Sequence, residues 1–239
     1  MRRTQRWQLR ADHASSVAFI YPRNKPGKIF LEVKDPSYTL GVFRGQLCPI
    51  GGNWLGELAR EDSGPLDTLR REVGEELCLT RYAGTQSPTS EDIQALGRLK
   101  GAICSKELAL GTYLCKIGKE ALGMDSSGSA YDEFLVLSSY WRVPLDDGLW
   151  ELLESLQRKF GNLSCESQTC VTSLDEILSS GARVAFGHDE ALREFFASIG
   201  LPRGRSILPT PGIRSVFAGW NSKTYEECLR RCDIAQRPR

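Results

Sequence analysis

Three glutamates near the end of a predicted helix are the residues of this chain best suited to phosphate or metal chemistry. Glu72, Glu75 and Glu76 are spaced i, i+3 and i+4, and this spacing places side chains on one face of an α-helix. Like charges at this spacing repel each other and cost a few tenths of a kcal/mol per pair. Their concentration in one helical turn therefore favours a bound cation that removes the repulsion.

A hard dication such as Mg²⁺ is the cation that such a group fits. It takes oxygen ligands in an octahedron, usually a few carboxylates, waters and substrate phosphates. A bound dication stabilises charge on a transferring phosphoryl group and positions or activates water. The glutamates are therefore candidates for a diphosphate-hydrolysis site. A solvated helix face is the alternative interpretation, because such strings are frequent in exposed helices.

Local signals predict that these glutamates lie on a helix over residues 65–77. Pro65 suits the first helical position, and Asp67 lies in the first turn, where an acidic residue is favourable. At about 100° per residue, four apolar side chains fall on one stripe beside the carboxylates and are expected to pack against the core. They are Leu66, Leu69, Val73 and Leu77.

The sequence around this helix resembles the Nudix hydrolase box. Gly51 is followed after five residues by Glu57, and later by Arg-Glu-Val-Gly-Glu-Glu at residues 71–76. The family's box reads Gly, five residues, Glu, seven residues, then Arg-Glu-aliphatic-x-Glu-Glu-x-Gly-aliphatic. The preceding Cys-Pro-Ile-Gly-Gly at residues 48–52 looks like the strand end and glycine turn of the family. The resemblance of the box itself covers residues 51–79.

This chain departs from the family's box at two places. Thirteen residues, 58–70, separate Glu57 from the arginine where the family has seven. Because loops tolerate insertions well, we expect the extra residues to form an extended loop, with Glu57 still near the helix glutamates. Arg60, Glu61 and Asp62 are predicted to form an exposed bulge in it. Cys78 replaces the late glycine of the box, so the turn after the helix is expected to differ.

The resemblance implies roles for individual residues. Arg71 looks like the residue that fixes the helix carboxylates by a charge-assisted hydrogen bond. The metal ligands implied are Glu57, Glu72, Glu75 and Glu76. The catalytic residues implied are Glu72, Glu75, Glu76 and Arg71, with one of the glutamates as a candidate base.

A further acidic residue is expected later in the chain, as in many members of the family. Glu166 is the first candidate, because the segment after it resembles the family's late strand, and Glu133 is the second. For both, an exposed loop carboxylate is the alternative interpretation. His188 precedes a predicted helix and is interpreted as a cap-region residue rather than a catalytic one.

The order of the predicted elements indicates an α/β fold, and the resemblance implies a Nudix-like α/β/α sandwich with a mixed sheet. A turn is expected at Gly51-Gly52 and a short helix at 90–99. A capping box is expected at Ser173 and Glu176. Strands are predicted at 15–21, 28–33, 109–118, 132–143 and the start of 169–178, and helices at 65–77, 145–161, 189–200 and near 223–233.

Charge divides the chain into three predicted parts. A basic N-terminal arm covers residues 1–13, a Nudix-like hydrolase domain covers 14–200, and a basic C-terminal extension covers 201–239. The basic ends carry no aromatic-rich RNA motif, so a nucleic-acid partner is not expected. No apolar run has the roughly 18–20 residues that span a bilayer. The lack of a secretory signal, with eight cysteines interpreted as reduced thiols, leads us to expect a cytoplasmic protein.

Together these features lead us to expect a Nudix-type pyrophosphohydrolase. It would use Mg²⁺ or Mn²⁺ and cleave the diphosphate bond of a nucleoside-diphosphate derivative by attack of water. The alternative is a Nudix-fold protein that binds a nucleotide, or regulates in response to it, without hydrolysing it. A homodimer is an arrangement that the sequence leaves open.

Overall fold

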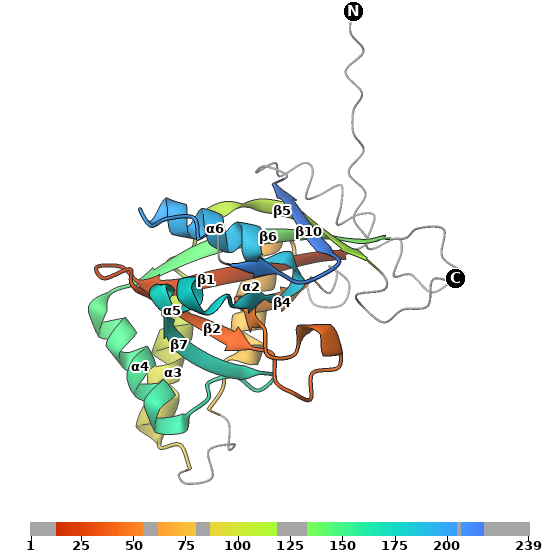
Figure 1. The fold of residues 1–239 in the computed structure, drawn as a ribbon. Helices are drawn as coiled ribbons and strands as arrows, with labels where there is room; N and C mark the ends of the chain where they lie inside the picture. The colour runs from red at the N-terminus through yellow and green to blue at the C-terminus, as the bar shows by residue number, and fades with distance from the viewer. Residues whose placement is uncertain (1–12, 55–61, 80–86, 119–132, 205–206, 218–239) are drawn as a thin grey trace, which may run out of the picture.

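A mixed β-sheet with helices on both faces makes up the fold of this chain (Figure 1). The computed structural model describes residues 13–54, 62–79, 87–118, 133–204 and 207–217. The strands are β1 (His13–Pro22), β2 (Lys28–Val33), β3 (Leu47–Cys48), β4 (Ile50–Asn53), β5 (Leu108–Gly118), β6 (Glu133–Leu145), β7 (Gln168–Ser173), β8 (Arg183–Val184), β9 (Leu208–Pro209) and β10 (Ile213–Phe217). The helices are α2 (Pro65–Glu76), α3 (Ser90–Ile103), α4 (Asp147–Phe160), α5 (Leu174–Ser180) and α6 (Asp189–Ser198), with 3₁₀ turns η1 (Gly41–Phe43) and η4 (Ala185–Gly187).

Strand β1 is the centre of the sheet. It runs parallel to β6 along its whole length and antiparallel to β2 and β4. The order across the sheet is β10-β5-β6-β1-β2-β3-β8-β9, with β4 also paired to β1 and β7 to β2. One edge of β1 pairs with β4 over its first residues and with β2 further along. The neighbour of β1 on that edge therefore changes from β4 to β2.

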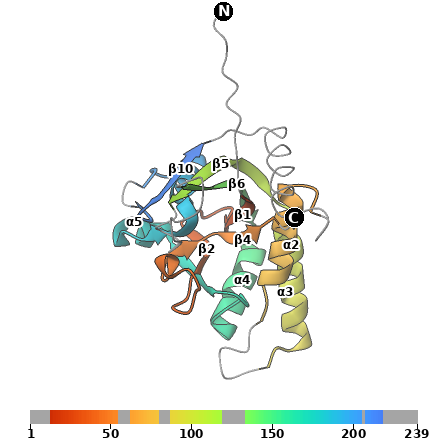
Figure 2. The same ribbon diagram turned by 90° about the vertical axis from the view of Figure 1, so that its right-hand side faces the viewer.

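Alternate residues of β1 enter two separate cores, as the twofold periodicity of a strand requires. Ala18 and Ile20 pack with α2, α3 and α4 on one face. Val17 and Phe19 pack with α5 and α6 on the other face. Figure 2 shows α2, α3 and α4 on one side of the strands and α5 on the other. The predicted α/β/α sandwich with a mixed sheet is therefore confirmed.

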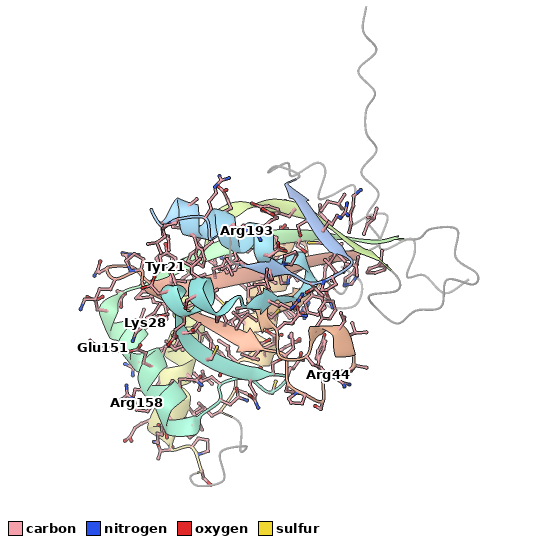
Figure 3. All side chains as sticks on the ribbon, viewed as in Figure 1. Tyr21, Lys28, Arg44, Glu151, Arg158 and Arg193 are labelled. Carbon is pink, nitrogen blue, oxygen red and sulfur yellow. The ribbon has the colours of Figure 1, made fainter. Side chains whose placement is uncertain are left out.

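Helix α4 shows why the predicted helices form. Its apolar stripe, which includes Trp150 and Phe160, is buried, while Glu151 and Arg158 are exposed. Figure 3 shows these two charged side chains on the outer side of α4. Asp146 accepts a hydrogen bond from the first turn and Gly161 ends the helix in the left-handed conformation, as expected for an N-cap and a C-cap.

Several predicted elements differ in detail from those observed. Gly51 and Gly52 lie within β4, paired with Val17 and Ser16, so the predicted turn at this position is wrong. The expected short helix at 90–99 extends to Ile103 as α3. The capping box of Ser173 with Glu176 is present. Within the range predicted as a C-terminal extension, β9 and β10 join the sheet.

Some predictions concern residues outside the described ranges. These are the N-terminal arm up to residue 12, the box residue Glu57, the bulge residues Arg60 and Glu61, and the helix expected near 223–233. No helix within the described ranges combines the length and the apolar character that crossing a membrane would require.

Candidate active site

Helix α2 forms where its sequence predicts and presents the glutamates to the sheet. Pro65 occupies its start, and Leu69, Val73 and Leu77 are buried in the core, with Leu66 partly buried beside them. The predicted packing stripe is therefore confirmed. Of the three glutamates, Glu72 and Glu76 are also buried and Glu75 is exposed, so the carboxylate face is only partly solvated.

The end of α2 shows how Cys78 is accommodated after the helix. Leu77 already has an extended backbone and pairs with Ser164 in an isolated bridge. The Cys78 amide donates to the Leu163 carbonyl, and the Cys165 amide donates to the Glu76 carbonyl, each at 3.0 Å. Because the chain leaves the helix directly into an extended bridge, no left-handed residue is needed there.

A cleft with a volume of about 560 Å³ opens beside α2, where β1, β4 and β6 meet. Ligand sites commonly have volumes in this range. Carboxylates form one part of its lining: Glu72, Glu75, Glu76 and Glu166. Aromatic and apolar side chains form another part: Tyr38, Leu40, Ile117, Phe134, Val136 and Phe186. The cleft therefore offers a negatively charged wall together with an apolar one.

Arg71 holds the carboxylate wall in place. Its Nη1 atom donates to Glu72 Oε1 at 2.8 Å and to Glu75 Oε2 at 3.0 Å. Its Nη2 atom donates to the carbonyl of Asn53 at the end of β4, at 2.7 Å. Charge-assisted hydrogen bonds of this length are among the stronger ones. The ion pair predicted between Arg71 and the helix carboxylates is therefore present.

Asp62 contradicts the prediction of an exposed bulge. Its side chain is buried and forms an ion pair with Arg71 at 3.0 Å. Its carbonyl also accepts a hydrogen bond from the buried Trp54 indole at 3.0 Å. A carboxylate next to a partly buried guanidinium is drawn inward because each charge lowers the cost of burying the other. The segment before α2 thus supplies a partner for Arg71.

Burial perturbs the two inner glutamates. Burial raises the pKa of Glu72, with Arg71 opposing the change. Burial and the neighbouring Glu32 raise the pKa of Glu76 well above its usual range. The Gly51 amide donates to Glu76 Oε2 at 3.1 Å. Both carboxyl groups therefore lie where negative charge is poorly compensated, which is typical of functional sites.

A buried network beneath Glu76 was not found from the sequence. Lys34 Nζ donates to Glu32 Oε2 at 2.9 Å and to Ser167 Oγ at 3.2 Å, and Ser164 Oγ donates to Glu32 Oε1 at 2.7 Å. Burial opposes the charge of Lys34, yet Glu32 and Glu76 raise its pKa overall. The one available signal was a glutamate within the otherwise apolar residues 29–33 of β2.

The structure brings Glu166 to the cleft that the helix glutamates line. Its side chain is exposed, and its amide donates to Ser164 Oγ at 3.2 Å. Its catalytic role stays a prediction. Glu133 begins β6, and its side chain lies outside the described part of the structure. His188, interpreted as a cap-region residue, is the N-cap of α6 and also lines the cleft.

The donor chemistry of the cleft fits the dication that the resemblance implies. Its carboxylates are hard oxygen donors, and the raised pKa values of Glu72 and Glu76 reflect burial and mutual repulsion that a cation would relieve. Within the described ranges, no group of three or more His, Cys, Asp or Glu side chains is arranged to hold a metal ion. Arg71 hydrogen-bonds to one carboxylate oxygen of Glu72 and to one of Glu75.

Comparisons with known proteins leave the family of this chain open. No family model matches the sequence, and no curated protein matches it. Among solved structures, the chain is similar to the crystal structure of a mutT/nudix family protein from Listeria innocua. The TM-score is 0.41 at 13% sequence identity, over 80% of this chain and 96% of that one. At this level of similarity, neither family nor activity follows for this chain.

Proposed function

We propose that this chain is a Nudix-type hydrolase that cleaves the diphosphate bond of a nucleoside-diphosphate derivative. The observation that carries the proposal is the carboxylate wall of the cleft, where the glutamates of α2 meet Glu166. The box-like sequence of residues 51–79 supports it. In this reaction water attacks one phosphorus, the bond to the bridging oxygen breaks, and a carboxylate accepts the proton of the water.

The residues of the chain would have the following roles in this reaction. Glu72, Glu75 and Glu76 would hold Mg²⁺ or Mn²⁺, with Glu57 as a further ligand. When bound, the dication supplies compensation for the negative charge of the phosphate oxygens. Arg71 would keep the glutamates oriented while they are not bound to the cation, and Glu166 is the candidate for a further proton acceptor at the opening of the cleft.

A nucleotide-binding protein without hydrolytic activity is the second candidate. The observation in its favour is that Arg71 hydrogen-bonds to both Glu72 and Glu75. If Arg71 stays hydrogen-bonded to these carboxylates when a nucleotide binds, the cleft would bind the nucleotide without hydrolysing it.

A substrate screen separates the two candidates. Nucleoside-diphosphate derivatives are incubated with the chain and Mg²⁺ or Mn²⁺, and the products are identified by mass, with EDTA as the metal-free control. We expect a nucleoside monophosphate among the products of at least one derivative, and none with EDTA. Binding of these compounds without product under either metal would contradict hydrolysis and favour the second candidate.

The two neighbouring glycines of β4 provide a test of how Glu72 is positioned. A Cβ atom at Gly52 would lie 2.5 Å from Glu72 Oε2, so Gly52→Ala must displace that carboxylate. Because the backbone of Gly52 does not lie in the left-handed region, we expect the melting temperature to be kept while hydrolysis falls about tenfold or more, as misplacement of a reacting group predicts.

Gly51→Ala is the contrasting variant. Gly51 has a φ of 128°, and a Cβ there would overlap the Ser16 carbonyl oxygen. We therefore expect a loss of more than about 1 kcal/mol in the free energy of unfolding. If Gly52→Ala kept full activity, or lost as much stability as Gly51→Ala, the role given to Gly52 would be wrong. Thermal unfolding and steady-state rates measure both effects.

A further inference from the structure

Both histidines of the chain line the cleft. The sequence contains two histidines, His13 at the start of β1 and His188 after η4, and these positions are far apart along the chain. Both contribute to the cleft, together with the aromatic and apolar side chains of its second wall. Residues of this kind have no place in the carboxylate chemistry proposed above, so they require another explanation.

A hydrogen bond to Tyr140 fixes the orientation of the His188 ring. It is 4% exposed, and its Nδ1 atom lies 2.6 Å from the hydroxyl oxygen of the fully buried Tyr140. Burial, with Lys34 adding to it, lowers the pKa of His188 to about 3. The ring is therefore a neutral imidazole at physiological pH. Because Nδ1 is engaged by Tyr140, Nε2 is the ring nitrogen left for a ligand.

His13 has a similar character. Its side chain is hydrogen-bonded to Asn53, and burial lowers its pKa. Its ring lies 6.5 Å from the ring of Phe134, centroid to centroid. The cleft therefore holds two uncharged imidazoles beside apolar rings. Neutral polar edges next to aromatic faces suit an uncharged planar ligand better than an anion.

Phe186 is held in an unusual backbone conformation within this wall. It has a φ of 55°, the left-handed region that bulky residues seldom adopt, and its side chain is only partly buried. Its ring packs 4.0 Å from that of Phe43 and meets the edge of Tyr38 at 6.2 Å. Strain of this kind costs on the order of 1–3 kcal/mol and clusters at ligand sites.

We infer that Tyr38, Phe186 and His188 form a subsite for the base of a nucleotide, with His188 as a specificity-determining residue. The ring of Phe186 stacks on the base, and the imidazole of His188 hydrogen-bonds to its polar edge. The choice of a nucleotide as ligand rests on the proposed function. A cleft of about 560 Å³ has room for a base together with phosphates at the carboxylate wall.

Binding without metal tests the subsite separately from hydrolysis. The full chain is titrated in EDTA with AMP, GMP, CMP and UMP by calorimetry, and with ribose 5-phosphate as the ligand that lacks a base. We expect at least one nucleotide to bind tenfold or more tightly than ribose 5-phosphate. Phe186→Gly, which suits the left-handed backbone, should weaken that binding about tenfold, because base stacking on an aromatic ring is lost.

The remaining variants identify the role of His188. His188→Asn should change the order of preference among the four nucleotides, which a merely structural role would not do. Tyr38→Leu is a second test of the aromatic wall should Phe186→Gly fail to fold. Ile93→Ala, at a 60% exposed site on α3, is the control and should change nothing.

Clear outcomes overturn the subsite. These are equal binding of the nucleotides and ribose 5-phosphate, no measurable binding of any nucleotide, or an unchanged affinity in folded Phe186→Gly and Tyr38→Leu. An unchanged order of preference in His188→Asn overturns the role of His188. Base-dependent binding with no hydrolysis in the substrate screen would instead reject the proposed hydrolase while keeping the subsite.

Discussion

Replacing Glu76 by glutamine is expected to lower the rate of diphosphate hydrolysis about 100-fold or more while the protein stays folded. Glutamine keeps an oxygen that can accept the hydrogen bond from the Gly51 amide, but it loses the charge that a dication or a transferred proton requires. The same change removes the cost of burying a charge and the repulsion from Glu32 and Glu72, which together outweigh the lost attraction to Lys34, because the pKa of Glu76 is raised overall. We therefore expect the free energy of unfolding to stay the same or to rise.

Rates over a range of Mg²⁺ concentrations and a denaturation curve measure this variant. Glu151→Gln is the matched control, because this exposed glutamate lies on the outer side of α4 (Figure 3). The control should leave both quantities unchanged. Full activity of Glu76→Gln with the same Mg²⁺ requirement would show that the assignment of Glu76 to the site is wrong.

Lys34→Met should destabilise the protein by about 3–5 kcal/mol, because it leaves the carboxylate of Glu32 buried without its cation. Glu32 is fully buried and Lys34 nearly so, with 2.9 Å between their charged atoms. The double variant Glu32→Gln/Lys34→Met removes both charges together. It should therefore recover part of the stability, since Glu32 no longer carries an unpaired charge, while Glu76 still lacks the attraction of Lys34. Urea denaturation gives the free energy of unfolding for each variant.

A second lysine on the same strand serves as the control for this prediction. Lys28 forms a pair with Glu154 at 2.7 Å, but its side chain is 52% exposed. Lys28→Met should cost less than about 1 kcal/mol, as exposed ion pairs do. Equal losses for Lys28→Met and Lys34→Met would contradict the account of a buried pair that supports the carboxylate wall.

Local signals predicted the longer elements of this fold, whereas the strands β8, β9 and β10 were not predicted. Alternating and β-branched residues predicted the strand over 28–33 as it is observed, and the proline, the apolar stripe and the acidic first turn predicted α2. Gly51 and Gly52 were mistaken for a turn, because glycine marks both turns and strands approached closely by another group. In β4 the close neighbours are the Ser16 carbonyl and the Glu72 carboxylate.

The candidate site was predictable only in part. The glutamates of α2 share a local spacing, so the sequence alone groups them. Asp62 was predicted to be exposed because no local pattern in the sequence shows that the fold places it next to Arg71. The pairing of Lys34 with Ser167, or of His188 with Tyr140, joins residues with no common local pattern. Periodicity reports which face a residue occupies, and it carries no information about which distant segment covers that face.

The parallel pairing of β1 with β6 has a consequence for the order of folding. Ser15 and Ser138, whose hydroxyls lie 2.7 Å apart on these strands, are 123 positions apart in the chain. Pairing them closes a long loop, and such contacts form slowly because the entropy of closure is lost before they stabilise the chain. During synthesis the edge of β1 that pairs with β6 therefore stays unpaired until β6 is made, and an unpaired edge is open to aggregation. The cleft forms only when β1 and β6 have paired, because both strands line it.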